Sequence, residues 1–125
     1  MEKLVIDTNY LVYLAKEKKF DKLFELIKIY DCYIIKGTIN EIEKLKKGKY
    51  KLRINLLLEE INKLIKEKKL KIIETNNVDA TILKLASEGF NVASYDKEIE
   101  KKINKLIKEK KLKIKIIKDL KKFKT

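Results

Sequence analysis

Four acidic residues each follow a short apolar, strand-like segment of the chain. In an open parallel sheet the carboxyl ends of all strands lie along one edge, where ligands bind, so the spacing predicts four carboxylates in one cleft. Clustered carboxylates raise one another's pKa unless a cation offsets them, and oxygen ligands suit Mg²⁺ or Mn²⁺. We therefore interpret the cluster as a candidate site for one or two such ions. The acids are Asp7, Glu41, Asp79 and Asp96, in the segments LVIDTN (4–9), CYIIKGTINE (32–41), KIIETNNVD (71–79) and FNVASYD (90–96).

Each acid also has a purely structural interpretation. Asp7 and Asp96 fit the N-cap position of a helix. Glu41 closes the sequence Thr38-Ile39-Asn40-Glu41, which fits a capping box beginning at Thr38. Asp79 lies in a predicted first helical turn, where a carboxylate meets the positive end of the helix dipole. Taken singly these alternatives stay open, but they do not explain four acids on one edge of a chain with net charge +13.

Short apolar runs alternate with helical patterns along the chain. Strands separated by helices indicate βαβ units around a central parallel sheet, with helices on both faces because crossovers are right-handed. No Gly- or Ser-rich linker divides the sequence, which predicts a single domain over residues 1–125 with a basic tail at about 118–125. The predicted strands are 3–6, 32–36, 70–74, 91–94 and 111–117, and the predicted helices are 8–16, 20–30, 38–46, 50–69, 77–88 and 96–109.

One segment is repeated. The sequence INKLIKEKKLKI occurs at 61–72 and again at 103–114. We interpret both copies as the end of a helix running into the next strand, favouring reuse of one local solution over a functional repeat.

Composition limits the classes of protein. One cysteine and no histidine exclude zinc sites, intramolecular disulfides and His-dependent triads. No apolar run approaches the roughly 18 residues of a membrane span, and no secretory signal is present, so we expect a cytoplasmic protein without membrane contact. The lysine-rich, proline-free composition is typical of a thermophile, although an AT-rich genome would give the same bias.

The positive charge predicts a nucleic acid partner, because lysine contacts to phosphate release counterions and steer association. Residues 97–125 hold 13 lysines against four acids and are candidates for a phosphate-binding rim, although most single lysines fit an ordinary solvated surface. Tyr10 and Tyr95 are candidates for stacking on unpaired bases. The candidate RNA-binding cations on the other wall are Lys36, Lys44, Lys46, Lys47 and Arg53.

Four motifs, taken together, resemble those of the PIN-domain nucleases over essentially the full chain. The resemblance implies a three-layer α/β/α sandwich with a central five-stranded parallel sheet. It also implies Mg²⁺- or Mn²⁺-dependent endoribonuclease chemistry. The motifs are VIDTN (5–9), INEIEKL (39–45), VDATILKLA (78–86) and ASYDKEI (93–99).

The resemblance also assigns roles to residues. It implies that Asp7, Glu41, Asp79 and Asp96 are the catalytic, metal-binding carboxylates. Many relatives carry paired aspartates where this chain has Val78-Asp79, so a second metal position is in doubt. Homodimers are common among such proteins. The polar supports it implies, which orient the carboxylates or contact the scissile phosphate, are Thr8, Asn9 and Ser94.

Three functions are compatible with this pattern. The first is an RNA-cleaving enzyme, either a VapC-type toxin neutralised by an antitoxin or an RNA-processing nuclease that works with ribosomal-assembly proteins. The short chain and basic tail slightly favour processing. The second is a non-catalytic RNA-binding scaffold on the same fold. The third, a phosphotransfer domain with Asp7 as nucleophile, is disfavoured because Asn9 stands where that class carries a second aspartate.

Overall fold

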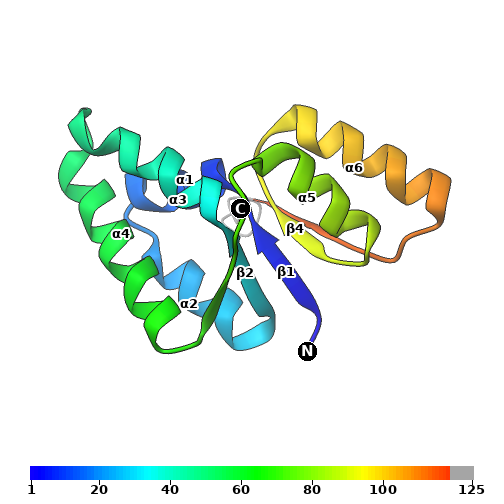
Figure 1. Cartoon of the computed structure of the whole chain (residues 1–125), viewed down its shortest axis with the longest axis horizontal. Helices are drawn as coiled ribbons and strands as arrows, with labels where there is room; N and C mark the ends of the chain where they lie inside the picture. Colours follow the sequence, from blue (N-terminus) through cyan, green and yellow to red (C-terminus); the bar gives the residue numbers. More distant parts are fainter. Residues whose placement is uncertain (119–125) are drawn as a thin grey trace, which may run out of the picture.

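A computed structural model describes residues 1–118 as a central sheet with helices on both faces (Figure 1). Apart from Lys118, the predicted basic tail lies outside the described residues. No helix in the described part of the chain is long and apolar enough to cross a bilayer.

The sheet contains five strands, all parallel, in the spatial order β3-β2-β1-β4-β5. This confirms the predicted three-layer fold with a five-stranded parallel sheet. The strands are β1 (Lys3–Ile6), β2 (Asp31–Ile35), β3 (Leu70–Ile73), β4 (Asn91–Ala93) and β5 (Ile116–Ile117). The helices are α1 (Thr8–Lys16), α2 (Phe20–Ile29), α3 (Lys36–Glu43), the 3₁₀ helix η1 (Lys44–Lys47), α4 (Lys51–Lys66), α5 (Val78–Ser87) and α6 (Lys97–Lys110).

Alternating side chains of the strands divide the core between the two faces of the sheet. In β1, Leu4 and Ile6 pack with α1, α2, α3 and α4, whereas Val5 packs with α5 and α6. This period of two is the one that a strand buried on both faces requires. Figure 1 shows the first group of helices on one side of the sheet and α5 and α6 on the other.

The strand order reverses between β1 and β4. The chain builds outward from β1 to β2 and β3, and then α5 returns it to the opposite side of β1, where β4 and β5 follow. Ile6 pairs with Ala93 in the ladder, and the Asp7 N–H donates to the Ala93 carbonyl oxygen at 2.9 Å. In doubly wound sheets ligands bind at such a switch point. The fold therefore places Asp7 at the position where a ligand is expected.

Three elements differ from the sequence prediction by more than one residue at an end. The helix predicted over 38–46 begins two residues earlier and changes to η1 after Glu43. The helix predicted over 50–69 ends at Lys66, because Lys68 adopts a left-handed conformation with φ 61°. The strand predicted over 111–117 is reduced to Ile116–Ile117. Before it, the Lys115 N–H bonds to the side-chain oxygen of Asn91 instead of a backbone carbonyl.

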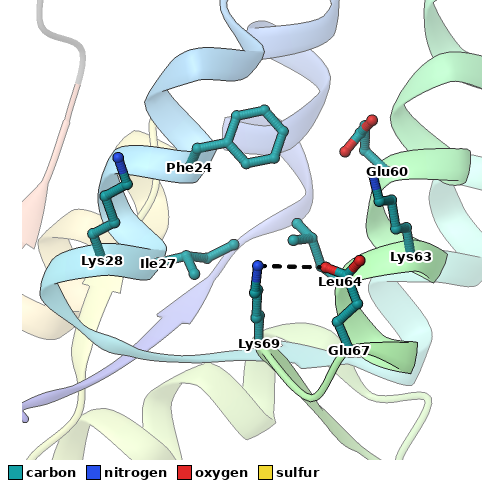
Figure 2. A pocket seen from close by; sticks show the side chains of 8 residues that line it. All are labelled: Phe24, Ile27, Lys28, Glu60, Lys63, Leu64, Glu67 and Lys69. Atoms are coloured by element: carbon teal, nitrogen blue, oxygen red, sulfur yellow. Dashed lines mark ion pairs between the residues drawn. The ribbon is translucent and has the colours of Figure 1, made fainter.

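An apolar groove of about 500 Å³ lies between α2 and α4 (Figure 2). Phe24 and Ile27 contribute its apolar wall, and Lys69, which pairs with Glu67 at 3.5 Å, lies at one end. Because Lys69 directly precedes β3, this groove lies towards the amino ends of the strands. It is therefore not part of the candidate site, which lies at the carboxyl ends.

Candidate active site at the carboxyl edge of the sheet

Asp7 lies between the end of β1 and the start of α1, and its side chain is only 4% exposed. Its Oδ1 accepts from the Thr8 N–H at 2.8 Å, and its Oδ2 accepts from the Ser94 hydroxyl at 2.7 Å. Asp7 is thus the N-cap of α1, as the structural interpretation predicted. Its second oxygen, however, accepts from a residue that directly follows another strand, β4, which a cap does not require.

Ser94 connects two of the predicted acids. Its side chain is buried, and its Oγ accepts the Asp96 N–H at 3.0 Å while donating to Asp7. Asp96 caps α6 through Oδ1, which accepts from the N–H groups of Glu98 and Ile99 at 2.9 and 3.4 Å. Within the described residues Oδ2 of Asp96 takes part in no hydrogen bond, so one oxygen of this carboxylate is available to a ligand.

Glu41 reaches the site through Thr8. The Thr8 hydroxyl donates to Glu41 Oε1 at 2.5 Å and shares a second hydrogen bond, of 3.1 Å, with the hydroxyl of Thr38. The capping-box interpretation of Glu41 is wrong, because α3 begins at Lys36 and Thr38 is its third residue rather than its N-cap. Thr38 is fully buried. The exposed Glu41 side chain is therefore oriented toward the site by hydroxyl groups, not toward the start of its own helix.

Asp79 lies in the first turn of α5 and is exposed. The cap of that helix is Asn77, whose Oδ1 accepts the Ala80 N–H at 3.2 Å, so Asp79 has no capping bond of its own. Among the described residues it forms no hydrogen bond or ion pair. A pocket of about 520 Å³ lies between α3 and α5, lined by Glu41, Asn76, Asn77, Val78 and Asp79.

Close contact holds the two walls of this pocket together. The Gly37 N–H donates to the Thr75 carbonyl oxygen, and the Asn40 amide donates to Asn76 Oδ1, both at 2.9 Å. A Cβ at Gly37 would lie 2.4 Å from the Asn76 carbonyl oxygen, so this glycine lets the segment before α5 pass against α3. Val78 is buried against the same glycine and belongs to the core beneath α5.

The electrostatics identify three of the four acids as neighbours. Burial raises the pKa of Asp7 above its ordinary value, and the negative charges of Asp79 and Asp96 raise it further. The hydrogen bonds from Ser94 and Thr8 act in the opposite direction and lower the pKa. Asp7 therefore lies close enough to both carboxylates for repulsion, with only neutral donors around it.

The donor set suits a divalent cation. Five ion pairs occur among the described residues, yet none involves Asp7, Glu41, Asp79 or Asp96. A chain with net charge +13 thus leaves these four acids without a cationic partner in its described part. As the side chains stand there, no three of them converge closely enough to form a ready metal-binding group. Oxygen-only ligands fit Mg²⁺ or Mn²⁺.

Asn9 forms a hydrogen bond between two segments of the candidate site that the sequence did not specify. Its Oδ1 accepts the Tyr95 N–H at 3.1 Å, which joins α1 to the connection between β4 and α6. Hydrogen bonds through Ser94 and through Asn9 therefore fix the position of Asp96 relative to Asp7.

The structure contradicts the prediction that Tyr10 stacks on RNA bases. The Tyr10 side chain is 1% exposed and its ring is stacked on that of Tyr95, with centroids 5.0 Å apart. Tyr95 also contacts the Tyr13 ring at 4.8 Å. These rings pack on the face of the sheet that carries α1. Burial of the large apolar area of a tyrosine ring stabilises the fold, which favours packing over exposure to solvent.

The predicted RNA-binding cations are distributed over α3, η1 and α4. Lys36 is exposed at the start of α3, and Lys44, Lys46 and Lys47 are exposed on η1, where Lys46 pairs with Glu43 at 2.9 Å. Arg53 is half-buried and donates from Nη1 to the Lys16 carbonyl oxygen at 2.6 Å. The Arg53 guanidinium therefore donates a hydrogen bond to a carbonyl oxygen at the carboxyl end of α1.

The sequence did not predict the contacts of Thr38, Asn40 and Asn76 at the candidate site. The signal available was Gly37-Thr38 directly after a buried strand, which marks a close backbone approach. The capping-box interpretation instead predicts that the Thr38 hydroxyl caps a helix, whereas it contacts Thr8.

A doubly wound parallel sheet with a buried aspartate at its switch point, and further carboxylates around it, is the arrangement expected of a PIN-domain nuclease. Ribonuclease VapC4 of Methanocaldococcus jannaschii is 38% identical to this chain over 112 aligned positions, and the match covers 82% of each protein. The chain belongs to the VapC-type family of PIN-domain ribonucleases. No protein-family model matches it.

Proposed function

We propose that the protein is a Mg²⁺- or Mn²⁺-dependent endoribonuclease that hydrolyses RNA phosphodiester bonds at the carboxyl edge of its sheet. The observation that carries the proposal is the buried Asp7 carboxylate at the switch point, which has Asp79 and Asp96 as like-charged neighbours and no cationic partner in the described residues. The similarity to a VapC ribonuclease supports the same activity.

The residues have distinct tasks in this proposal. Asp7 and Asp96 would hold the principal cation. Both oxygens of Asp7 and one oxygen of Asp96 are oriented by hydrogen bonds. Glu41 and Asp79 would complete the surroundings of the cation from the two walls of the pocket. When bound, the metal ion lowers the pKa of water and offsets charge on the phosphate. Ser94 and Thr8 keep the carboxylates oriented before the substrate arrives, which is the usual function of groups behind metal ligands.

The proposal includes partners. RNA is the substrate, and as a member of a toxin family the chain would be neutralised by an antitoxin. Association into a homodimer and a role in RNA processing, with ribosomal-assembly proteins as partners, remain predictions.

The test is incubation with structured and unstructured RNA in Mn²⁺ or in EDTA. Cleavage that requires Mn²⁺ and is lost in Asp96→Asn is the expected result, because the variant keeps an oxygen for the helix cap but loses the negative charge. The matched control is Asp21→Asn, which removes an exposed acid in the first turn of α2. RNA binding without cleavage in any metal would instead identify a non-catalytic scaffold and refute the proposal.

A further inference from the structure

A cluster of positive charges lies at the opposite end of α1 from the acids. The Nζ atoms of Lys16 and Lys49 lie 5.2 and 5.6 Å from the centroid of the Tyr50 ring, and the Arg53 guanidinium carbon lies 5.6 Å from it. Each distance is that of an attractive cation–π contact. Three cations around one ring nevertheless repel one another.

No ion pair in the described part of the chain neutralises this cluster. None of Lys16, Lys49 and Arg53 forms an ion pair there. The hydrogen bond from Arg53 to the Lys16 carbonyl oxygen fixes the guanidinium and supplies only the partial negative charge at the carboxyl end of α1. The concentration of charge is therefore unbalanced, as it is at the four acids, but with the opposite sign.

The local backbone also favours an anion. The cluster surrounds the start of α4, whose first turn contains no acid and whose N-cap, Tyr50, provides no side-chain hydrogen bond. A helix start normally attracts negative groups, yet here Lys51 adds a further cation. A cavity of about 360 Å³ is lined by these residues: Lys49, Tyr50, Lys51, Leu52 and Arg53.

Helix α1 connects this cavity to the candidate site. Its first residue, Thr8, bonds to Asp7 and Glu41, and its last residue, Lys16, contacts Tyr50. Eight residue steps of 1.5 Å place the two ends roughly 12 Å apart along the helix axis. Figure 1 shows η1 and the start of α4 on the same side of the sheet as α1 and α3.

We propose that the cluster of Lys16, Lys49 and Arg53 around Tyr50 binds backbone phosphates of the RNA whose scissile bond lies at the acidic site. This inference rests on the proposed function, and it names where the RNA strand continues beyond the site. Phosphate contacts position a nucleic acid without reading its sequence. Tyr50 acts as a positioning residue, since its ring holds the three cations together.

The test compares two double variants that remove the same charge. Lys16→Gln/Lys49→Gln alters the cluster, and Lys28→Gln/Lys66→Gln alters two exposed lysines on α2 and at the end of α4, neither of which forms an ion pair in the described residues. Binding of a short fluorescein-labelled single-stranded RNA is followed by anisotropy in EDTA, where nothing is cleaved, at about 50 to 200 mM salt.

Loss of two phosphate contacts on a single strand should reduce the slope of log K against log salt by about 1.4, equivalent to roughly 25-fold weaker binding at 0.1 M salt. The control pair should leave the slope near that of the wild type. Equal slopes for the two double variants would overturn the inference. Binding of inorganic phosphate alone would also overturn the inference. In that case phosphate would stabilise the protein thermally, but the cluster variant would show no change in the salt slope of RNA binding.

The positioning role of Tyr50 has a separate readout. Tyr50→Phe keeps the ring and should retain the wild-type slope, whereas Tyr50→Leu should lower it although both variants are apolar. Equal slopes for Phe and Leu would refute this role. Cleavage of the same RNA by the wild type with Mn²⁺ is measured in parallel. Cleavage together with equal slopes for the two double variants refutes only the phosphate cluster. A reduced slope for the cluster variant without cleavage by the wild type refutes only the proposed activity.

Discussion

Replacing Gly37 by alanine should destabilise the protein and displace one wall of the candidate site. The added Cβ would lie 2.4 Å from the carbonyl oxygen of Asn76 and 2.8 Å from the Asn76 carbonyl carbon and from Val78 Cγ2. Two of these three atoms belong to the backbone and cannot rotate away. The segment that leads to Asn77 and Asp79 must therefore move.

Two effects of opposite sign determine the magnitude. Alanine is a better helix former than glycine by roughly 0.5–1 kcal/mol, and Gly37 is the second residue of α3, so propensity alone predicts stabilisation. Overpacking a well-filled site costs typically 1–3 kcal/mol. Because the clash is with backbone, we expect the second effect to dominate, with a net loss of about 1–2 kcal/mol and a Tm lower by about 4–8 °C for a domain of this size.

The measurement is urea and thermal denaturation of Gly37→Ala beside Gly48→Ala. At Gly48 a Cβ would meet only the Leu45 carbonyl oxygen, at the ordinary contact distance of 3.5 Å. The control should therefore be nearly neutral. A Gly37→Ala protein as stable as the Gly48→Ala protein would refute the close approach of α3 and the segment before α5.

Three further outcomes follow from named contacts. Thr8→Val removes the hydroxyl that contacts Glu41 and Thr38 and should weaken Mn²⁺ binding about 10–100-fold, measured by calorimetry. Thr8→Ser keeps a hydroxyl and should retain the wild-type affinity. Equal affinities in all three proteins would contradict the role of the hydroxyl. Asn77→Ala should lower the unfolding free energy by about 1 kcal/mol in urea titrations, and Asn77→Ser should recover most of it, because the cap of α5 is the Asn77 side chain. Burial raises the pKa of the Cys32 thiol to about 12 from 9.0. The thiol of the unfolded chain therefore loses its proton at a lower pH, and the unfolding free energy should fall as pH rises from 9 toward 12. A Cys32→Ala protein should lack this part of the pH dependence, and rapid reaction of native Cys32 with a thiol reagent at pH 8 would contradict its burial.

The fold was predictable because alternation of apolar runs and helical patterns is a local property. The two copies of the repeated segment show the limit of prediction from local pattern, because they adopt different structures. In residues 61–72, Lys68 is left-handed and Leu70 starts β3 with a side chain 1% exposed. In residues 103–114 the helix continues to Lys110, and no strand follows directly. The sequences are the same, so the difference comes from what lies beside them: β3 pairs along four residues of β2, whereas β5 pairs with only Val92 and Ala93.

The acids of the candidate site were predictable from their order after the strands, but the contacts between them were not. A two-residue error in the start of α3 assigned Thr38 to a cap, although its buried hydroxyl meets Thr8. The predicted base-stacking role of Tyr10 failed because exposure depends on tertiary packing. The charge of Arg53 predicts a contact with RNA, but no local pattern reveals its hydrogen bond to the end of α1.

The central claim is that these carboxylates form a divalent metal site, and stability with and without Mn²⁺ tests it most directly. In EDTA, Asp7→Asn should be at least as stable as the wild type, because a buried charge with like-charged neighbours has been removed. With Mn²⁺ at 100 times its Kd, the wild type should gain about 2.7 kcal/mol of unfolding free energy, and Asp7→Asn should gain far less. An equal gain in both proteins, or none in the wild type, would contradict a metal site at Asp7.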